Sequence, residues 1–114
     1  MINGINSREM ILEILLEIEE GEHSHVAIRN ALSKYQFLPK QDRAFITRVC
    51  EGTLEYRIQI DYIINSFSKV TVDKMKPAIR EILRSAVYQL KYMDSVPDSA
   101  VCNEAVKLAQ RKGF

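Results

Sequence analysis

The sequence predicts an all-α protein, and three observations point to that fold class. Its 114 residues suit one domain, because a chain of this length builds a single hydrophobic core. Only four glycines and three prolines interrupt it. Between them the apolar residues recur every three or four positions, as on one face of a helix, and do not alternate with polar residues as in a strand. We therefore expect about six helices in one domain.

The first two helices are predicted to form a hairpin. Asn6 or Ser7 can cap the first helix, and Gly21 can end it. Its broad apolar face consists of Ile11, Leu12, Leu15, Leu16 and Ile18. Ser24 can cap the second helix, which extends to the loop around Pro39. Its apolar stripe consists of Ile28, Leu32 and Tyr35.

The apolar pattern from about Lys40 to Phe67 is too long for one average helix, so we divide it near Tyr56 and Arg57. Gly52 lies inside the first of the two resulting helices, where glycine costs about 1 kcal/mol relative to alanine. It therefore indicates close packing of another helix and not a phosphate-binding loop. Residues 68–76 are predicted to be a polar connection.

The fifth predicted helix has the clearest pattern of the six. Pro77 suits its first turn, and its apolar residues fall within about 140° of arc. They are Ile79, Ile82, Leu83, Ala86, Val87, Leu90 and Met93. A sixth helix is predicted from Asp98 or Ser99 to Gly113, and the apolar Phe114 after this glycine leads us to expect that the native chain continues. Across the chain, the residues expected in the core are Leu15, Ile18, Phe45, Val49, Leu83, Val87 and Leu90.

The net charge of +1 conceals an asymmetry along the chain. Residues 1–22 hold six glutamates against Arg8 alone, a net charge of −5, whereas the other 92 residues hold 15 lysines and arginines against 9 acidic residues, a net charge of +6. A basic patch that meets phosphate is therefore compatible with the near-neutral total. With neither a signal peptide nor an apolar membrane span in the sequence, we expect a cytoplasmic protein.

The sequence offers little for catalysis or metal binding. Its glycines cannot supply the glycine-rich turn of a dinucleotide-binding domain. His23 and His25 lack the spacing that places two ligands on one helical face, so a solvated turn is the preferred interpretation. Cys50 and Cys102 are unpaired in sequence and are interpreted as small buried residues. We expect no catalytic residue, no metal and no cofactor in this chain.

The fifth helix offers a nucleic-acid hypothesis instead. Lys76, Arg80, Arg84 and Lys91 fall within about 80° on a helical wheel and form one predicted basic edge. Tyr88 and Tyr92 are placed beside it on the solvent side, and cations interleaved with aromatic rings suit phosphate attraction and base stacking. The alternative is a solvated margin in which Arg84 pairs with a carboxylate such as Glu104. Arg8, Arg43 and Arg48 are the next candidates for RNA contact.

Five segments in order resemble the NusB-like RNA-binding domain. They are residues 41–45 (QDRAF), 51–54 (EGTL), 61–63 (DYI), 82–90 (ILRSAVYQL) and 96–106, in which Val96-Pro97 precedes Asn103-Glu104-Ala105-Val106. More narrowly, the chain is similar from about Arg8 to Phe114 to the N-terminal domain of the RsmB (Sun/Fmu) methyltransferases. These enzymes modify carbon 5 of a cytosine in small-subunit ribosomal RNA.

The resemblance implies a bundle of two antiparallel helical halves that binds ribosomal RNA and has no activity of its own. In the parent enzymes a separate C-terminal domain binds S-adenosylmethionine and supplies cysteines that follow proline or threonine, whereas Cys50 and Cys102 follow valine. The family's next helix would begin after Phe114. We therefore expect the chain to be an RNA-binding domain cut before that helix and the methyltransferase domain, with neither DNA nor a membrane as a partner.

Two alternatives stay open. Free-standing NusB proteins act in transcription antitermination, pairing with a small ribosomal protein on a leader RNA through basic residues near the N-terminus. Here that region offers Arg8 among six glutamates. The other alternative is a helical protein-interaction module without an RNA role.

Overall fold

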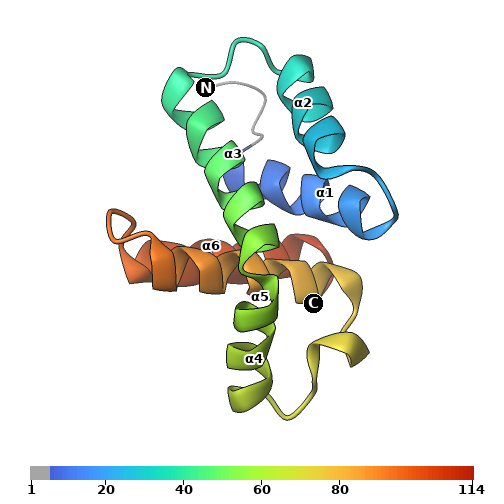
Figure 1. Cartoon of the computed structure of the whole chain (residues 1–114). Coiled ribbons are helices and arrows are strands. Elements are labelled where there is room, and N and C mark those ends of the chain that lie inside the picture. Colours follow the sequence, from blue (N-terminus) through green and yellow to red (C-terminus); the bar gives the residue numbers. More distant parts are fainter. Residues whose placement is uncertain (1–5) are drawn as a thin grey trace.

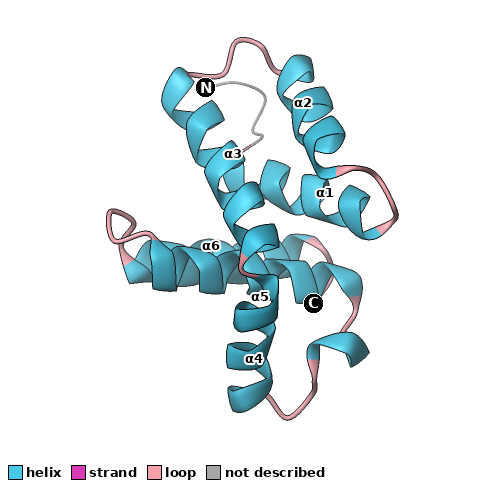
Figure 2. Cartoon of the chain, in the orientation of Figure 1, coloured by secondary structure: helices cyan, strands magenta, loops and turns pink. Residues whose placement is uncertain are grey.

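A computed structural model describes residues 6–114, and every regular element in that range is helical (Figures 1 and 2). The helices are α1 (Ser7–Glu19), α2 (Ser24–Lys34), α3 (Lys40–Glu55), α4 (Arg57–Phe67), the short 3-10 helix η1 (Val72–Lys74), α5 (Pro77–Tyr92) and α6 (Asp98–Arg111). The predicted all-α fold and the division of the long central pattern at Tyr56 are both confirmed.

Local sequence signals set most helix ends. The Asn6 side chain accepts a hydrogen bond of 2.8 Å from the Glu9 backbone N–H and so caps α1, as predicted. Gly21 and Gly113 follow α1 and α6 with φ of +117° and +88°, in the left-handed region that favours glycine. The cap predicted for α2 is wrong by one residue, because Ser24 is already helical and makes no capping bond.

The helices form two halves that meet at α5 (Figure 1). Helices α1, α2 and α3 make the first half, and α4, α5 and α6 make the second. Helix α5 packs against α1, α3, α4 and α6, which places it at the centre of the molecule. Helix α4 contacts α5, α3 and η1 and projects at one end of the molecule. Because α1 lies against α5, the two halves are joined through packing as well as through the chain.

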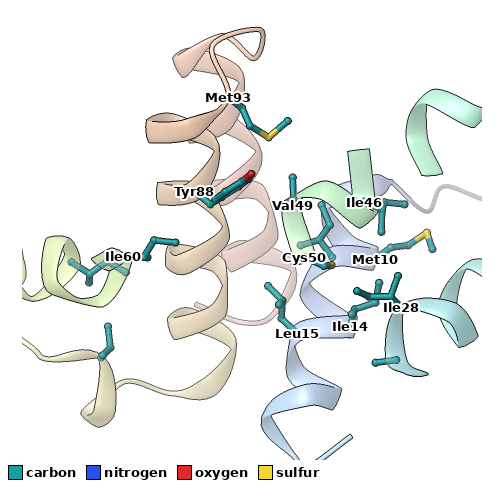
Figure 3. Close-up of a cluster of buried hydrophobic side chains, with 14 residues drawn as sticks. Met10, Ile14, Leu15, Ile28, Ile46, Val49, Cys50, Ile60, Tyr88 and Met93 are labelled. Carbon is teal, nitrogen blue, oxygen red and sulfur yellow. The ribbon is translucent and has the colours of Figure 1, made fainter. Parts of the chain in front are cut away.

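The main core lies between α1, α2, α3 and α5 (Figure 3). Its labelled side chains are Met10, Ile14, Leu15, Ile28, Ile46, Val49, Cys50, Ile60, Tyr88 and Met93. A smaller cluster joins α1 to α5 and α6 through Leu12, Ile82 and Leu108. The connection after α4 also contributes, since Val72 of η1 is buried and its N–H donates to the Asn65 side chain at 2.9 Å.

The prediction of the core is confirmed for α1 and α3 and is partly wrong for α5. Leu15 and Val49 are fully buried, whereas Ile18, Phe45, Leu83 and Val87 are half-buried against the core. Leu90, expected inside, is 40% exposed. Helix α5 turns a largely polar side inward instead. The buried residues of that side are Glu81, Ile82, Arg84, Ser85, Ala86, Tyr88 and Gln89.

Candidate nucleic-acid interface

The basic edge predicted on α5 is largely neutralised by carboxylates. Arg84 is buried, and its guanidinium donates in a bidentate fashion to Asp61 of α4 at 2.8 and 2.9 Å. It also donates to Glu81 at 2.7 Å. The pairing with Glu104 considered above does not form in the structure. The interpretation of Arg84 as a solvent-facing cation is therefore wrong, because its charge is paired across helices.

Arg80 is held in the same network. Its guanidinium donates to the two carboxylate oxygens of Glu19 at 2.9 and 2.5 Å. The third donor group reaches the backbone carbonyls of Val72 and Met75, each at 3.0 Å. Arg80 thus fastens α5 to the end of α1 and to η1, so its geometry is that of a structural residue.

The network holds three carboxylates against two guanidiniums. Burial and a hydrogen bond with Glu19 raise the pKa of Glu81 to about 8. The hydrogen bond from Arg80 holds the pKa of Glu19 well below its usual range. A proton retained by Glu81 leaves Glu19 and Asp61 as the two anions that balance Arg80 and Arg84. This neutral arrangement meets the requirement that buried charges be paired.

The other two residues of the predicted edge lie at its opposite ends. Lys76 and Lys91 are both exposed and are separated by about 22 Å of helix, from the rise of 1.5 Å per residue. The Lys76 ammonium lies 5.9 Å from the centre of the Phe114 ring, and the Lys91 ammonium lies 5.6 Å from that of Tyr92. The four cations therefore do not form one continuous strip, and RNA contact by any of them stays a prediction.

The remaining candidate arginines occupy three different settings. Arg8 is half-buried, donates to Gln89 at 3.0 Å and lies 5.2 Å from the centre of the Phe45 ring. Arg43 donates to the carbonyls of Leu32 and Tyr35 at 3.0 and 3.1 Å, which satisfies acceptors at the end of α2. Arg48 is exposed, and its guanidinium donates to the Tyr92 carbonyl at 3.3 Å.

An open groove of about 620 Å³ runs along α3, and three cationic side chains line it. It brings together three of the predicted residues, Arg43, Arg48 and Tyr88, with residues that the prediction did not include. The full lining is Leu32, Lys40, Arg43, Ala44, Thr47, Arg48, Glu51, Gly52, Glu55 and Tyr88. Three cations in this lining outnumber two glutamates. We call this hollow the α3 groove.

A cluster of three tyrosine rings, which we call the tyrosine stack, adjoins the α3 groove. The Tyr56 and Tyr92 ring centres are 4.5 Å apart with an interplanar angle of 18°, and Tyr88 lies 5.3 Å from Tyr92 and 6.4 Å from Tyr56, so the three centres form a triangle. Tyr88, expected on the solvent side, is only 5% exposed, so that expectation is wrong. Its ring occupies the space that a Cβ atom on Gly52 would fill. The interpretation of Gly52 as a site of close packing is thereby confirmed.

Sequence reasoning missed Lys40, Tyr56 and Gln59, the last of which accepts a hydrogen bond from the Tyr92 hydroxyl. One signal for Tyr56 was present. Gly52 and Tyr56 are four residues apart and so lie on one helical face, next to whatever approaches the glycine. No comparable signal singles out Gln59, because its partner is 33 residues away in sequence.

The described residues show no arrangement suited to metal or nucleophile chemistry. No group of three histidine, cysteine or acidic side chains that could hold a metal ion occurs in residues 6–114. Burial raises the pKa of the Cys50 thiol to about 12, so that thiol stays protonated at neutral pH. Cys102 is exposed. Within the same range, no helix is long and apolar enough to cross a membrane.

Comparison of the sequence with known proteins identifies its relatives. A model described as the NusB family matches residues 5–113. Proteins named probable ribosomal RNA small subunit methyltransferase B, from Bacillus subtilis and Synechocystis, are 31% and 34% identical over 93% and 96% of this chain. The chain spans only 24% and 25% of their lengths. A transcription antitermination protein NusB from Bacillus velezensis is 32% identical over 94% of this chain and 80% of its own length.

Solved structures share the fold. A crystal structure of the antitermination factors NusB and NusE with dsRNA contains a chain that matches with a TM-score of 0.83 and 18% identity, over 93% of this chain and 80% of that one. NusB from T. maritima matches with a TM-score of 0.83 and 22% identity, over 95% and 77%. The expected NusB-like arrangement of the helices is confirmed by this likeness.

Proposed function

Because the chain belongs to the NusB family, we propose that it binds RNA, and that it does so as the RNA-binding part of a methyltransferase acting on small-subunit ribosomal RNA. The α3 groove is the observation that carries the proposal. Lys40, Arg43 and Arg48 line it together, and clustered cations of this kind attract the phosphate backbone irrespective of sequence.

The methyltransferase assignment draws on the two relatives of that name, which match nearly the whole chain. In this proposal the chain positions ribosomal RNA for a catalytic domain of the same protein, and that domain binds S-adenosylmethionine. The same proposal expects neither a cofactor nor a catalytic residue in the domain described here, and it places the protein's action in the cytoplasm.

A transcription antitermination factor is the second candidate, favoured by NusB relatives whose length the chain nearly covers. This candidate relies on basic residues near the N-terminus. In the structure Arg8, the cation of that region, is held against Gln89 and Phe45, and the rest of α1 presents carboxylates. The setting of Arg8 therefore favours the methyltransferase candidate.

Titration with RNA over a salt series tests the proposal. Wild-type chain should bind fragments of small-subunit ribosomal RNA with an affinity that falls as salt rises. Lys40→Gln with Arg48→Gln should weaken binding and flatten the slope of log affinity against log salt by up to about 1.4, from roughly 0.7 per contact to a single strand. Arg43 is left intact because it satisfies carbonyls at the end of α2.

The matched control is Lys69→Gln with Lys74→Gln, which removes two exposed cations from the connection after α4. This control should leave both affinity and slope unchanged. Tighter binding to an antitermination leader RNA than to ribosomal fragments would favour the second candidate. No salt-dependent binding to any RNA would overturn the proposal and favour a protein-interaction module.

A further inference from the structure

We propose that Tyr56, the most exposed ring of the tyrosine stack, receives an unpaired base of the bound RNA. This inference rests on the proposed RNA binding. It adds that the site prefers single-stranded RNA to duplex RNA. Tyr56 lies between α3 and α4, with φ of −101° and ψ of 19°, and its side chain is 38% exposed. It is the most exposed ring of the three, since Tyr88 is buried and Tyr92 half-buried.

The stack is held in place before any ligand arrives. Tyr88 is seated against Gly52, so its ring is fixed between α3 and α5. The Tyr92 hydroxyl donates to Gln59 of α4, and Arg48 of α3 donates to the Tyr92 carbonyl at 3.3 Å. Residues of three helices thus hold the rings in place. Because the rings are already ordered, a base that stacks on them binds with little loss of side-chain conformational entropy.

Cations surround the stack in a way that suits a nucleotide. Arg48 is bonded to the Tyr92 backbone, and Lys91 lies against the Tyr92 ring. Because Tyr88 lines the α3 groove and its ring centre lies 6.4 Å from that of Tyr56, a strand whose phosphates follow Lys40 and Arg48 is directed towards Tyr56. Glu51 and Glu55 on the same lining repel phosphate and thereby limit where the backbone can lie.

An unpaired base is the ligand that such a surface selects. In the interior of a duplex both faces of each base are covered by neighbouring bases, so a tyrosine ring can stack only on the two end pairs. A base in a loop or single strand offers a free face, and aromatic stacking of this kind tolerates any sequence. A duplex that binds through its phosphates alone requires the cations of the α3 groove but not the tyrosine rings.

Binding of a uridine 12-mer and of a 12-base-pair RNA duplex to the 114-residue chain separates these contributions. Tyr56→Ala should weaken binding of the single strand by about 5- to 100-fold, the range found when a stacking ring is removed, and leave duplex binding within twofold. Tyr56→Phe keeps the ring and should restore single-strand binding. Urea unfolding of each variant checks that the fold persists.

A fluorescent variant gives a second readout that does not depend on a loss of affinity. The chain contains no tryptophan, so Tyr56→Trp introduces a unique emission. Stacking of uracil on this indole should quench it during titration with the single strand and not with the duplex. Quenching that is absent at saturation, or a Tyr56→Ala variant that binds the single strand as wild type does, would overturn the inference.

The inference and the proposed function fail differently. If the Lys40 and Arg48 variant loses affinity for both RNAs while Tyr56→Ala loses none, the chain binds RNA and the stack is purely structural. If wild-type chain binds neither RNA, both proposals fall. Equal weakening of single strand and duplex by Tyr56→Ala would also refute selection of an unpaired base.

Discussion

Replacing Gly52 by alanine should test the contact between α3 and α5 that supports the tyrosine stack. A Cβ atom on Gly52 would overlap Cζ, Cε1 and Oη of Tyr88, far inside the separation of about 3.5 to 4.0 Å at which carbon atoms pack. The Tyr88 ring cannot yield easily, because it is 5% exposed and lies 5.3 Å from Tyr92. Alanine therefore has to displace either the ring or the helix.

The expected cost follows from the interactions that a displaced ring loses. Exposing a large buried side chain costs about 1.5 to 3 kcal/mol, and losing an aromatic pair costs about 0.5 to 1.5 kcal/mol. Alanine in place of glycine inside a helix returns about 1 kcal/mol. The Gly52→Ala variant should thus lose about 1 to 3.5 kcal/mol of its free energy of unfolding, a large share of the stability of a small domain.

Urea unfolding followed by circular dichroism measures this loss, and a double-mutant cycle identifies its cause. In a Tyr88→Ala background the overlap is gone, so adding Gly52→Ala should be neutral or stabilising by up to about 1 kcal/mol. Asn103→Ala, at an exposed position of α6, controls for helix propensity. A loss below about 0.5 kcal/mol for Gly52→Ala alone, or an equal loss in both backgrounds, would refute the reasoning.

Three further predictions concern the network, the core and the cofactor. Folding raises the pKa of Glu81 from 4.5 to about 8, so the folded protein holds this proton more tightly than the unfolded chain does. The resulting contribution to the free energy of unfolding is fully present below pH about 4.5 and is lost as pH rises through about 8. Glu81→Gln should therefore flatten the decline in stability between pH 4.5 and about 8 in urea unfolding, and a decline as steep as that of wild type would contradict the assignment. Leu15→Ala should cost about 2 to 5 kcal/mol because Leu15 is fully buried, whereas half-buried Leu83→Ala should cost about 1 to 2 kcal/mol, so equal losses would count against the packing described. Calorimetry of the 114-residue chain should detect no saturable micromolar binding of S-adenosylmethionine, and such binding would show a cofactor site that we do not expect.

Helix positions could be predicted from the sequence because their signals are local. Asn6 caps α1 through a residue three positions away, and Pro77 begins α5. The break at Tyr56 is visible as a pattern too long for one helix. In each case the interaction that sets the boundary connects residues within one or two turns, so spacing alone is informative.

The orientation of α5 could not be predicted in the same way. The apolar residues of α5 predict one inward face, yet Arg84 is drawn inside by Asp61, which is 23 residues earlier on another helix. A helical wheel of α5 alone does not include that partner. It therefore predicts Arg84 on a solvent-exposed edge and Leu90 in the core. For the same reason Gly52 indicated that something packs closely without indicating that it is Tyr88.

The packing of α1 against α5 and α6 has a consequence for how the chain folds during synthesis. Arg8 and its partner Gln89 are 81 residues apart, which at about 5 to 20 residues per second corresponds to roughly 4 to 16 seconds on the ribosome. For most of that interval Leu12 has neither Ile82 nor Leu108 to pack against, although it is 1% exposed in the finished structure. The first half of the protein is therefore synthesised with an apolar surface that only the second half covers, and folding is completed late.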